Sequence, residues 1–226
     1  MTAEFQAQSS PSPVTLYGLE RSVYTRIARL ALEEKGVAYA LREVEIFGPG
    51  GVPADHRARH PFGRIPAFEH GAFRLYETGA ITRYVDEAFD GPALQPREPA
   101  RRARMNQIVS LLDAYAYRPM VWGVFVERVR FPMSGRPSNE AKIAAALADA
   151  RLCLGALDGL VECKPCLLGP DITLADLHAF PILAYFALAP EGAACLREHA
   201  ALTRWIDQMQ ARQSVQRTRT VYEVAR

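Results

Sequence analysis

The chain has 226 residues, of which 49% are hydrophobic and 23% are charged, and its formal net charge at pH 7 is +2. This composition is ordinary for a globular protein of one or two domains and excludes a disordered or fibrous chain. The small net charge, the lack of aromatic residues among the arginines clustered at 97–104, and the absence of an apolar run near the roughly 20 residues of a bilayer span argue against a nucleic-acid or membrane partner.

The first part of the chain alternates strand and helix patterns. Residues 1–13 are polar and rich in serine and proline, which predicts a disordered tail. Residues 14–17 predict a buried strand, and the apolar spacing over 22–36 predicts a helix that stops at a glycine. Residues 39–46 predict a second strand. Because the order is strand, helix, strand, these two strands should be parallel with a right-handed crossover.

A second group of patterns follows a segment rich in proline and glycine. Residues 54–59 could make a short helix. Residues 67–69 and 73–76 predict an antiparallel hairpin. The period then changes, so that residues 79–89 predict an amphipathic helix with one face on the sheet. The order over 14–89 is therefore βαβ followed by ββα.

The remaining patterns are helical. Residues 90–98 predict a linker by their proline and glycine content, and the strand signals then stop. We expect residues 99–226 to form a second, all-helical domain. Within it, Thr173 and Asp176 have the spacing of a capping box, which predicts a helix start.

Cysteine and histidine usage gives weaker signals. The four cysteines all lie in the C-terminal half, which is sparse for a disulfide scaffold and favours reduced thiols in a cytoplasmic protein. Cys163 and Cys166 have the spacing of a redox pair, but they follow a long helical stretch, so we interpret them as loop residues. His56 and His60 have no third ligand nearby, and no metal site is predicted.

Five stretches, taken in order, resemble the cytosolic glutathione S-transferase family over about residues 14–213. They are residues 16–26, 30–36, 61–68, 77–81 and 172–176. The Pro-Phe-Gly-Arg-Ile-Pro run and the serine before the first helix look most like phi/theta-like bacterial members. The resemblance implies a thioredoxin-like α/β N-terminal domain, an all-α C-terminal domain and, usually, a homodimer.

The resemblance also implies a glutathione site. In this family the bond before Pro66 is cis, which would turn the main chain of Ile65 outward to pair with the cysteinyl part of the tripeptide. Thr78, at the start of a helix, would bind the γ-glutamyl carboxylate, and Glu77 would bind the ammonium. The family more often has serine at the position of Thr78. Threonine also has a hydroxyl that can donate a hydrogen bond, so Thr78 can fill the same role.

The glycyl carboxylate of glutathione requires a cation. Residues 48–60 contain His56, Arg57 and Arg59, and Arg64 lies just beyond them. The lysine usual in the family has no clear counterpart, because Gly50 and its neighbour occupy that register. We include Arg64 in the predicted site.

Ser22 lies where the phi and theta groups have their catalytic serine. A hydroxyl that donates to bound sulfur favours thiolate over thiol, and a pKa two units below about 8.5 corresponds to about 2.7 kcal/mol. Tyr17 and Tyr24 are competing hydroxyls that we rank lower. The electrophile's apolar pocket should lie along the first long helix of the second domain, with Tyr115 and Trp122 reaching the substrate.

The resemblance thus implies a glutathione transferase that conjugates a small hydrophobic electrophile, with glutathione as co-substrate and no metal. Two alternatives remain open. One is a non-catalytic binding or assembly module with the same fold, because fold alone does not establish catalysis. The other is a glutathione-dependent peroxidase or reductase, although no cysteine lies near Ser22 for mixed-disulfide chemistry.

Overall fold

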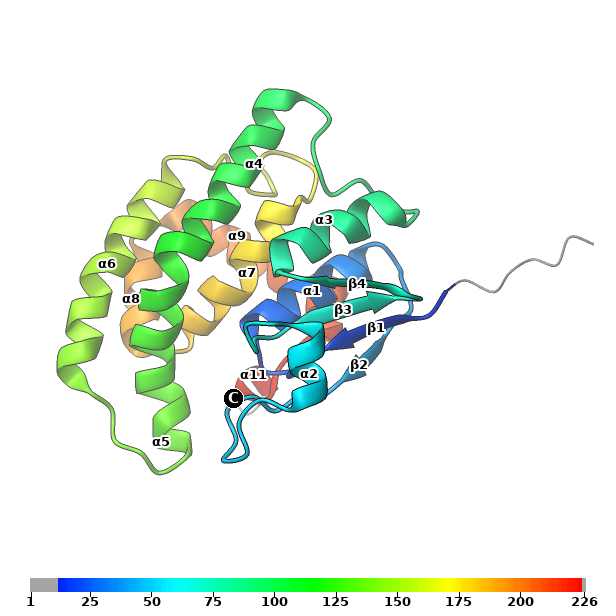
Figure 1. The fold of residues 1–226 in the computed structure, drawn as a ribbon. Coiled ribbons are helices and arrows are strands. Elements are labelled where there is room, and N and C mark those ends of the chain that lie inside the picture. The colour runs from blue at the N-terminus through cyan, green and yellow to red at the C-terminus, as the bar shows by residue number, and fades with distance from the viewer. Residues whose placement is uncertain (1–11, 225–226) are drawn as a thin grey trace, which may run out of the picture.

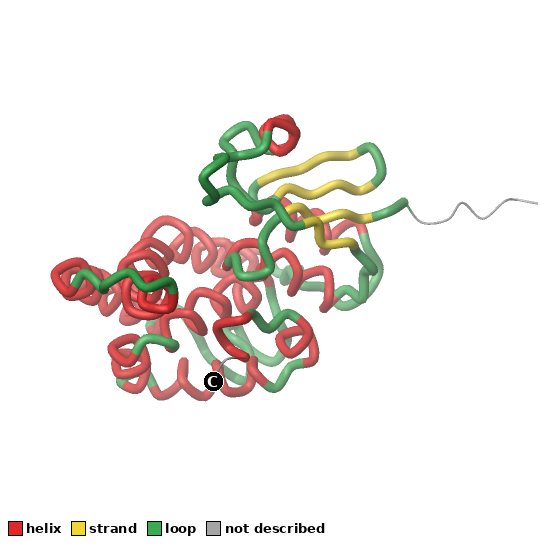
Figure 2. The backbone as a smooth tube through the Cα atoms, turned by 90° about the horizontal axis from the view of Figure 1, so that it is seen from below, coloured by secondary structure: helices red, strands yellow, loops and turns green. Residues whose placement is uncertain are grey.

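The computed structural model describes residues 12–224, so residues 1–11 of the predicted tail lie outside the described residues. Four strands form one sheet in the order β2-β1-β3-β4 (Figure 2). β1 (Val14–Tyr17) pairs in parallel with β2 (Ala40–Arg42) and antiparallel with β3 (Ala67–His70). β3 then forms an antiparallel hairpin with β4 (Phe73–Tyr76). The predicted parallel pair and hairpin are both confirmed.

β2 is shorter than the predicted strand over 39–46. Its register pairs Ala40 to Arg42 with Thr15 to Tyr17, the last residue of β1. Beyond that point Val44 makes only one long bond, 3.4 Å from its amide nitrogen to the carbonyl oxygen of Gly18. The alternating apolar residues after Arg42 therefore continue as a loop, because no partner strand within residues 12–224 extends alongside them.

Three helices accompany the sheet. α1 (Val23–Glu34) joins the parallel strands and contacts α3 (Thr78–Ala88) on one side of the sheet, while α2 (Ala54–Arg59) lies on the other (Figure 1). Apolar side chains fill the layer between α1, α3 and the sheet, and Leu16, Ile27 and Ile81 are completely buried there. The βαβ-ββα order is confirmed, with α2 inserted in the connection between β2 and β3.

The second half is helical from residue 99 onward. α4 (Pro99–Leu111) continues through wide π-type turns, η1 (Leu112–Ala116) and η2 (Arg118–Arg130), into α5 (Phe131–Met133). The later helices are α6 (Glu140–Asp158), α7 (Leu174–Ala187), α8 (Pro190–Arg197), α9 (Ala200–Gln210), α10 (Gln213–Arg217) and α11 (Val221–Val224). Within residues 12–224, no strand follows β4.

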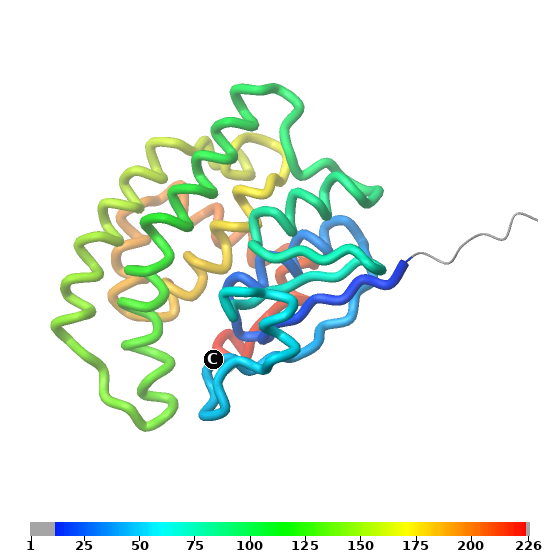
Figure 3. Tube along the Cα trace, viewed as in Figure 1, coloured from blue at the N-terminus to red at the C-terminus, as the bar shows by residue number. Residues whose placement is uncertain are grey.

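α7 is the central helix of the molecule. It contacts α1 from the first half and α4, η2, α8 and α9 from the second, and its residues from Leu174 to Phe186 are all buried. This helix therefore joins the two halves into one packed body (Figure 3). Among the described helices none alone has the length and apolar character of a membrane span, and α7 with α8 reaches them only as a pair bent by 120°.

The predicted capping box at the start of α7 is present. The amide and the hydroxyl of Thr173 both donate to Asp176 Oδ2, at 2.9 and 2.8 Å. Asp176 Oδ1 accepts from the amide of Leu167 and from Trp205 Nε1, at 2.7 and 2.9 Å. Asp176 is fully buried, so these four donors replace the water that its carboxylate loses on folding.

Replacing Thr173 with alanine should lower the free energy of unfolding by about 0.5–2 kcal/mol, because the start of α7 loses its capping hydroxyl. Urea titration followed by circular dichroism measures this change. Thr173→Ser is the matched control, since it keeps the hydroxyl that bonds Asp176. Equal losses for the serine and alanine variants would contradict the role of the hydroxyl.

Candidate active site

A cavity of about 650 Å³ lies between the two halves. Residues that the sequence places far apart meet on its wall. They include most of the predicted site: Ser22, Arg64, Ile65, Pro66, Glu77, Thr78 and Trp122. Tyr115 is the exception, because it does not line this cavity.

The peptide bond between Ile65 and Pro66 is cis, as predicted. Both residues line the large cavity, just before β3 begins at Ala67. Among the described residues, no hydrogen bond uses the amide or the carbonyl of Ile65. The preceding carbonyl, of Arg64, is instead bonded by His56 Nε2 at 2.7 Å. The amide and the carbonyl of Ile65 on the cavity wall are thus left to pair with an extended ligand.

The N-terminus of α3 forms the next part of the wall. Glu77 precedes the helix with φ +70° and ψ 113°, which is a strained conformation for a residue with a side chain. Its carbonyl oxygen accepts the amides of Ala80 and Ile81, both at 2.9 Å. Among the described bonds none uses the amides of Thr78 and Gly79, so the helix tip offers donors and a positive dipole end to a carboxylate.

The cations near this wall differ in their partners. Arg59 is held by Asp55 and Glu69, at 2.8 and 3.2 Å, and lies over the Tyr17 ring, so it is occupied outside the cavity. Arg64 and Arg118 line the cavity, and no described acid pairs with either. Arg57, the other cation predicted in the 48–60 segment, does not line the cavity.

His60 also lines the cavity, beside the ring of Tyr76 at 4.9 Å. Burial lowers its pKa below the usual value, although the charge of Glu77 opposes this. His60 is therefore neutral at pH 7 and can contribute a hydrogen bond rather than a positive charge. Within residues 12–224 no group of three or more His, Cys, Asp or Glu side chains is placed to hold a metal ion.

Ser22 lies directly before α1 and caps it, with Oγ accepting from the amide of Thr25 at 3.4 Å. Its hydroxyl hydrogen remains available to a ligand, because the cap uses Ser22 only as an acceptor. The competing hydroxyls are engaged: Tyr17 donates to Glu69 at 2.8 Å and Tyr24 donates to Asp113 at 3.0 Å. Burial raises the pKa of Tyr24 far above its usual value, so its phenol stays protonated.

Asp113 joins three elements at the edge of the large cavity. It accepts Tyr24 from α1 and is bonded by His178 Nε2 from α7, at 2.7 Å. Burial opposes ionisation of Asp113, but the bonds from His178 and Tyr24 outweigh it and hold its pKa below the usual value. Tyr24 also packs against Tyr117, with ring centroids 4.6 Å apart. Because the Tyr24 hydroxyl donates to Asp113 in this cluster, it is not free to donate to a ligand.

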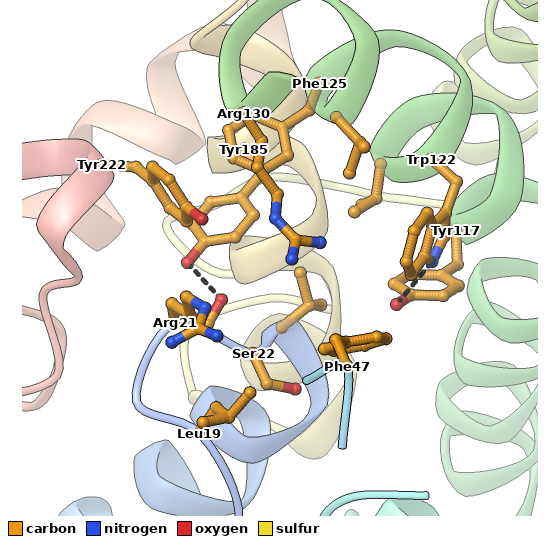
Figure 4. Close-up of a pocket in the computed structure, with 13 residues that line it drawn as sticks. Leu19, Arg21, Ser22, Phe47, Tyr117, Trp122, Phe125, Arg130, Tyr185 and Tyr222 are labelled. Atoms are coloured by element: carbon orange, nitrogen blue, oxygen red, sulfur yellow. Dashed lines mark hydrogen bonds between the residues drawn. The ribbon is translucent and has the colours of Figure 1, made fainter. Parts of the chain in front are cut away.

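A second, smaller cavity of about 60 Å³ adjoins the first (Figure 4). Its wall is mainly apolar and aromatic, with Leu19, Val23, Val121, Phe125, Val126, Tyr185 and Tyr222. Four residues line both cavities: Ser22, Phe47, Tyr117 and Trp122. Ser22 is therefore at the junction between a polar cleft and an apolar one.

The sequence-based choice of Tyr115 for the apolar pocket is wrong. Tyr115 is 69% exposed and lines neither cavity, whereas Tyr117 lines both. Two residues apart on a helix, the two side chains point in nearly opposite directions. Trp122, the other residue predicted for this pocket, lines both cavities, and its Nε1 donates to the Tyr117 hydroxyl at 3.0 Å.

The C-terminal segment closes one side of the small cavity. Glu223 of α11 forms an ion pair with the buried Arg26 of α1, at 2.7 Å. The Tyr185 hydroxyl donates to the carbonyl of Arg21 and to the Thr220 hydroxyl, at 2.8 and 3.0 Å. The bonds from Arg26 to Glu223 and from Tyr185 to Arg21 join residues more than 150 positions apart, and the segment they hold includes Tyr222 on the cavity wall.

The four cysteines lie outside both cavities, and none is in a disulfide. Burial raises the pKa of Cys163 and of Cys166 to about 11. Both thiols are therefore protonated at pH 7, which is the opposite of what a working redox pair needs.

Comparison with known proteins agrees with this geometry. A family model for the glutathione S-transferase N-terminal domain matches residues 16–93, and one for the C-terminal domain matches residues 121–213. "Glutathione S-transferase 1" of Triticum aestivum is 28% identical over 91% of this chain and 93% of its own length. "Glutathione S-transferase 4" of Zea mays is 29% identical over 88% of each chain.

A solved structure extends the likeness to three dimensions. The theta class glutathione S-transferase of Xanthomonas axonopodis pv. citri, solved with glutathione bound, has a TM-score of 0.73 and 29% identity over 92% of this chain and 97% of its own. The two domain models match most of the chain in the expected order, and the fold carries the same two halves. The chain belongs to the glutathione S-transferase family.

Proposed function

We propose that this protein is a glutathione transferase that stabilises the glutathione thiolate and conjugates it to a hydrophobic electrophile. The observation that carries the proposal is the position of Ser22 at the junction of the two cavities. A tripeptide in the polar cleft would have its sulfur near Ser22, with the apolar cavity on the sulfur's other side. The names of the matched relatives support the same activity.

Glutathione is an extended tripeptide with a charged group at each end. Its cysteinyl amide and carbonyl would pair with the free main chain of Ile65. Its γ-glutamyl carboxylate would bind the amides and hydroxyl at the start of α3 through Thr78, and its ammonium would bind Glu77. Arg64, which has no described acid partner, would bind the glycyl carboxylate.

The reaction needs a thiolate at neutral pH. The Ser22 hydroxyl donates a hydrogen bond to sulfur, and the start of α1 beside it adds a positive dipole end, so the thiol gives its proton to solvent more readily. The sulfur lone pair then forms a bond to the electrophilic carbon. The leaving group departs with its own bonding pair, or, in an addition, the carbon skeleton takes up a proton from water.

Several finer assignments belong to the same proposal. The Pro-Phe-Gly-Arg-Ile-Pro run and Ser22 favour a phi/theta-like bacterial member, and the theta-class structure above supports this grouping. Residues 14–89 and 99–226 would be its two domains, with the family models matched to each as support. The four free cysteines favour a cytoplasmic protein, and the resemblance to the family favours a homodimer.

The proposal is tested with the purified wild-type chain, glutathione and chlorodinitrobenzene, a neutral electrophile. Calorimetry should detect one glutathione site per chain. The conjugate should form faster with the protein than in a mixture of glutathione and chlorodinitrobenzene without it. Binding without any acceleration would contradict catalysis. Absence of binding would contradict the whole site.

A further inference from the structure

Arg130 is a cation in a cavity that is otherwise mainly apolar. It comes from the end of η2, is partly buried, and its guanidinium points into the small cavity between Tyr185 and Phe47 (Figure 4). Its charge lies 5.3 Å from the centre of the Phe47 ring, and that ring meets Trp122 edge-on at 6.0 Å. A planar, electron-poor group could thus lie beside aromatic walls and reach the guanidinium.

No described acid pairs with Arg130. The other arginine of the small cavity, Arg21, is bound to Glu45 at 2.5 Å. Glu45 also accepts the amide of Phe47 at 2.8 Å, so both of its oxygens are in use. Burial opposes ionisation of Glu45, but the Phe47 amide, Arg21 and Arg130 outweigh it and hold its pKa below the usual value. The carboxylate of Glu45 thus lies near Arg130, but both of its oxygens are already bonded to Arg21 and to the Phe47 amide.

Arg130 also lies outside the proposed glutathione seat. It lines the small cavity only, whereas Arg64 and Arg118 line the large one. A carboxylate of glutathione would meet those cations first. The donors of Arg130 face the side of Ser22 where the electrophile would be bound.

We propose that the preferred electrophiles of this enzyme are aromatic compounds that carry an anionic group, such as a carboxylate, held by Arg130. This inference rests on the proposed function and names its substrate class. A guanidinium in a mainly apolar cavity can bind a carboxylate through two parallel hydrogen bonds. The anchored ring then lies against Phe47 and Trp122 and presents its reactive carbon toward the sulfur beside Ser22.

The test compares a chloronitrobenzoate with the corresponding chloronitrobenzamide, which has the same shape and no charge. Thiolate sulfur displaces chloride from either ring, so the products differ only in the distal group. Arg130→Gln should lower kcat/KM for the acid by roughly 10- to 100-fold, mainly through KM, and change it less than threefold for the amide. Arg130→Lys should recover part of the loss. Lysine keeps the positive charge but cannot donate the two parallel hydrogen bonds of a guanidinium.

Arg136→Gln is the matched control. Arg136 lies over the Phe131 ring at 3.7 Å and lines neither cavity, so its removal takes away the same charge from the same region. It should affect acid and amide equally. Equal losses on both substrates in Arg130→Gln would overturn the proposal, as would a loss in Arg136→Gln specific to the acid.

A binding measurement separates this inference from the proposed function. Unreactive nitrobenzoate and nitrobenzamide, without the chlorine, can be titrated against the tryptophan fluorescence of the full chain, since Trp122 lines the cavity. Wild type should bind the acid at least tenfold more tightly than the amide, and Arg130→Gln should remove that preference. If wild type turns over neither substrate yet shows this preference, conjugation fails and the anion site stands. No preference for the acid would overturn the site, whatever the turnover.

Discussion

Ser22→Ala should lower the rate of glutathione conjugation at pH 7 by about 20-fold or more. With the hydroxyl removed, the bound thiol returns toward its ordinary pKa of about 8.5, where only a few per cent is thiolate. With it, a pKa two units lower makes most of the sulfur anionic. The loss should shrink as the pH rises, because above about pH 9 both enzymes would hold thiolate. Steady-state kinetics between pH 6 and pH 9 measures it.

Ser22 also caps α1, so stability must be separated from chemistry. Ser22→Gly costs the N-cap only about a few tenths of a kcal/mol and leaves no side-chain donor, while Ser22→Thr keeps both the capping oxygen and the hydroxyl. We expect the glycine variant to fold almost as stably as wild type and to be as slow as the alanine variant. The threonine variant should stay active. Full activity in Ser22→Gly would contradict the role of the hydroxyl.

Glu77→Gln combined with Thr78→Val should weaken glutathione binding by about 100-fold or more. The first change removes the charge that meets the ammonium, and the second removes a hydroxyl donor at the helix tip. The two residues act on opposite charges of the same γ-glutamyl group, so most of the effect should be on affinity rather than on the chemical step. Calorimetric titration with glutathione measures the loss.

The control for this pair lies on the same helix. Glu87→Gln removes a carboxylate near the end of α3, where it contacts only the Gln95 side chain among the described bonds. It should leave the glutathione affinity unchanged. If Glu77→Gln with Thr78→Val binds as tightly as Glu87→Gln, glutathione does not bind at the α3 tip.

The sequence predicted best those features that depend on local chemistry. The hairpin at 67–76 and the capping box at Thr173 each follow from residue types at fixed spacing, and both are present. The cis bond at Pro66 came from the resemblance, since a single proline does not reveal it.

Features set by tertiary packing were predicted less well. Tyr115 and Tyr117 are chemically alike, and only the direction of the helix in the fold decides that Tyr117 lines the cavities. Phe47 was missed because it lies in a loop with no periodic signal. Arg130 was missed because it ends η2 in the second half, while Phe47, the ring beside its guanidinium, comes from the first half.

The contribution of the C-terminal segment was also invisible in the sequence. Arg26 reads as one charged residue among others on a helix, yet it is fully buried and pairs with Glu223, nearly two hundred positions away. No local pattern encodes such a contact, because it depends on where the chain returns after α9. The same return brings Tyr222 to the small cavity.

The most direct measurement is the ultraviolet titration of the glutathione thiol bound to the wild-type chain. We expect thiolate absorbance that develops with a pKa about two units below the value of about 8.5 for a free thiol. Ser22→Gly, which has no side-chain donor, should bind glutathione but lose this shift. A bound thiol that titrates near its free value in the wild-type chain would contradict stabilisation of the thiolate by Ser22.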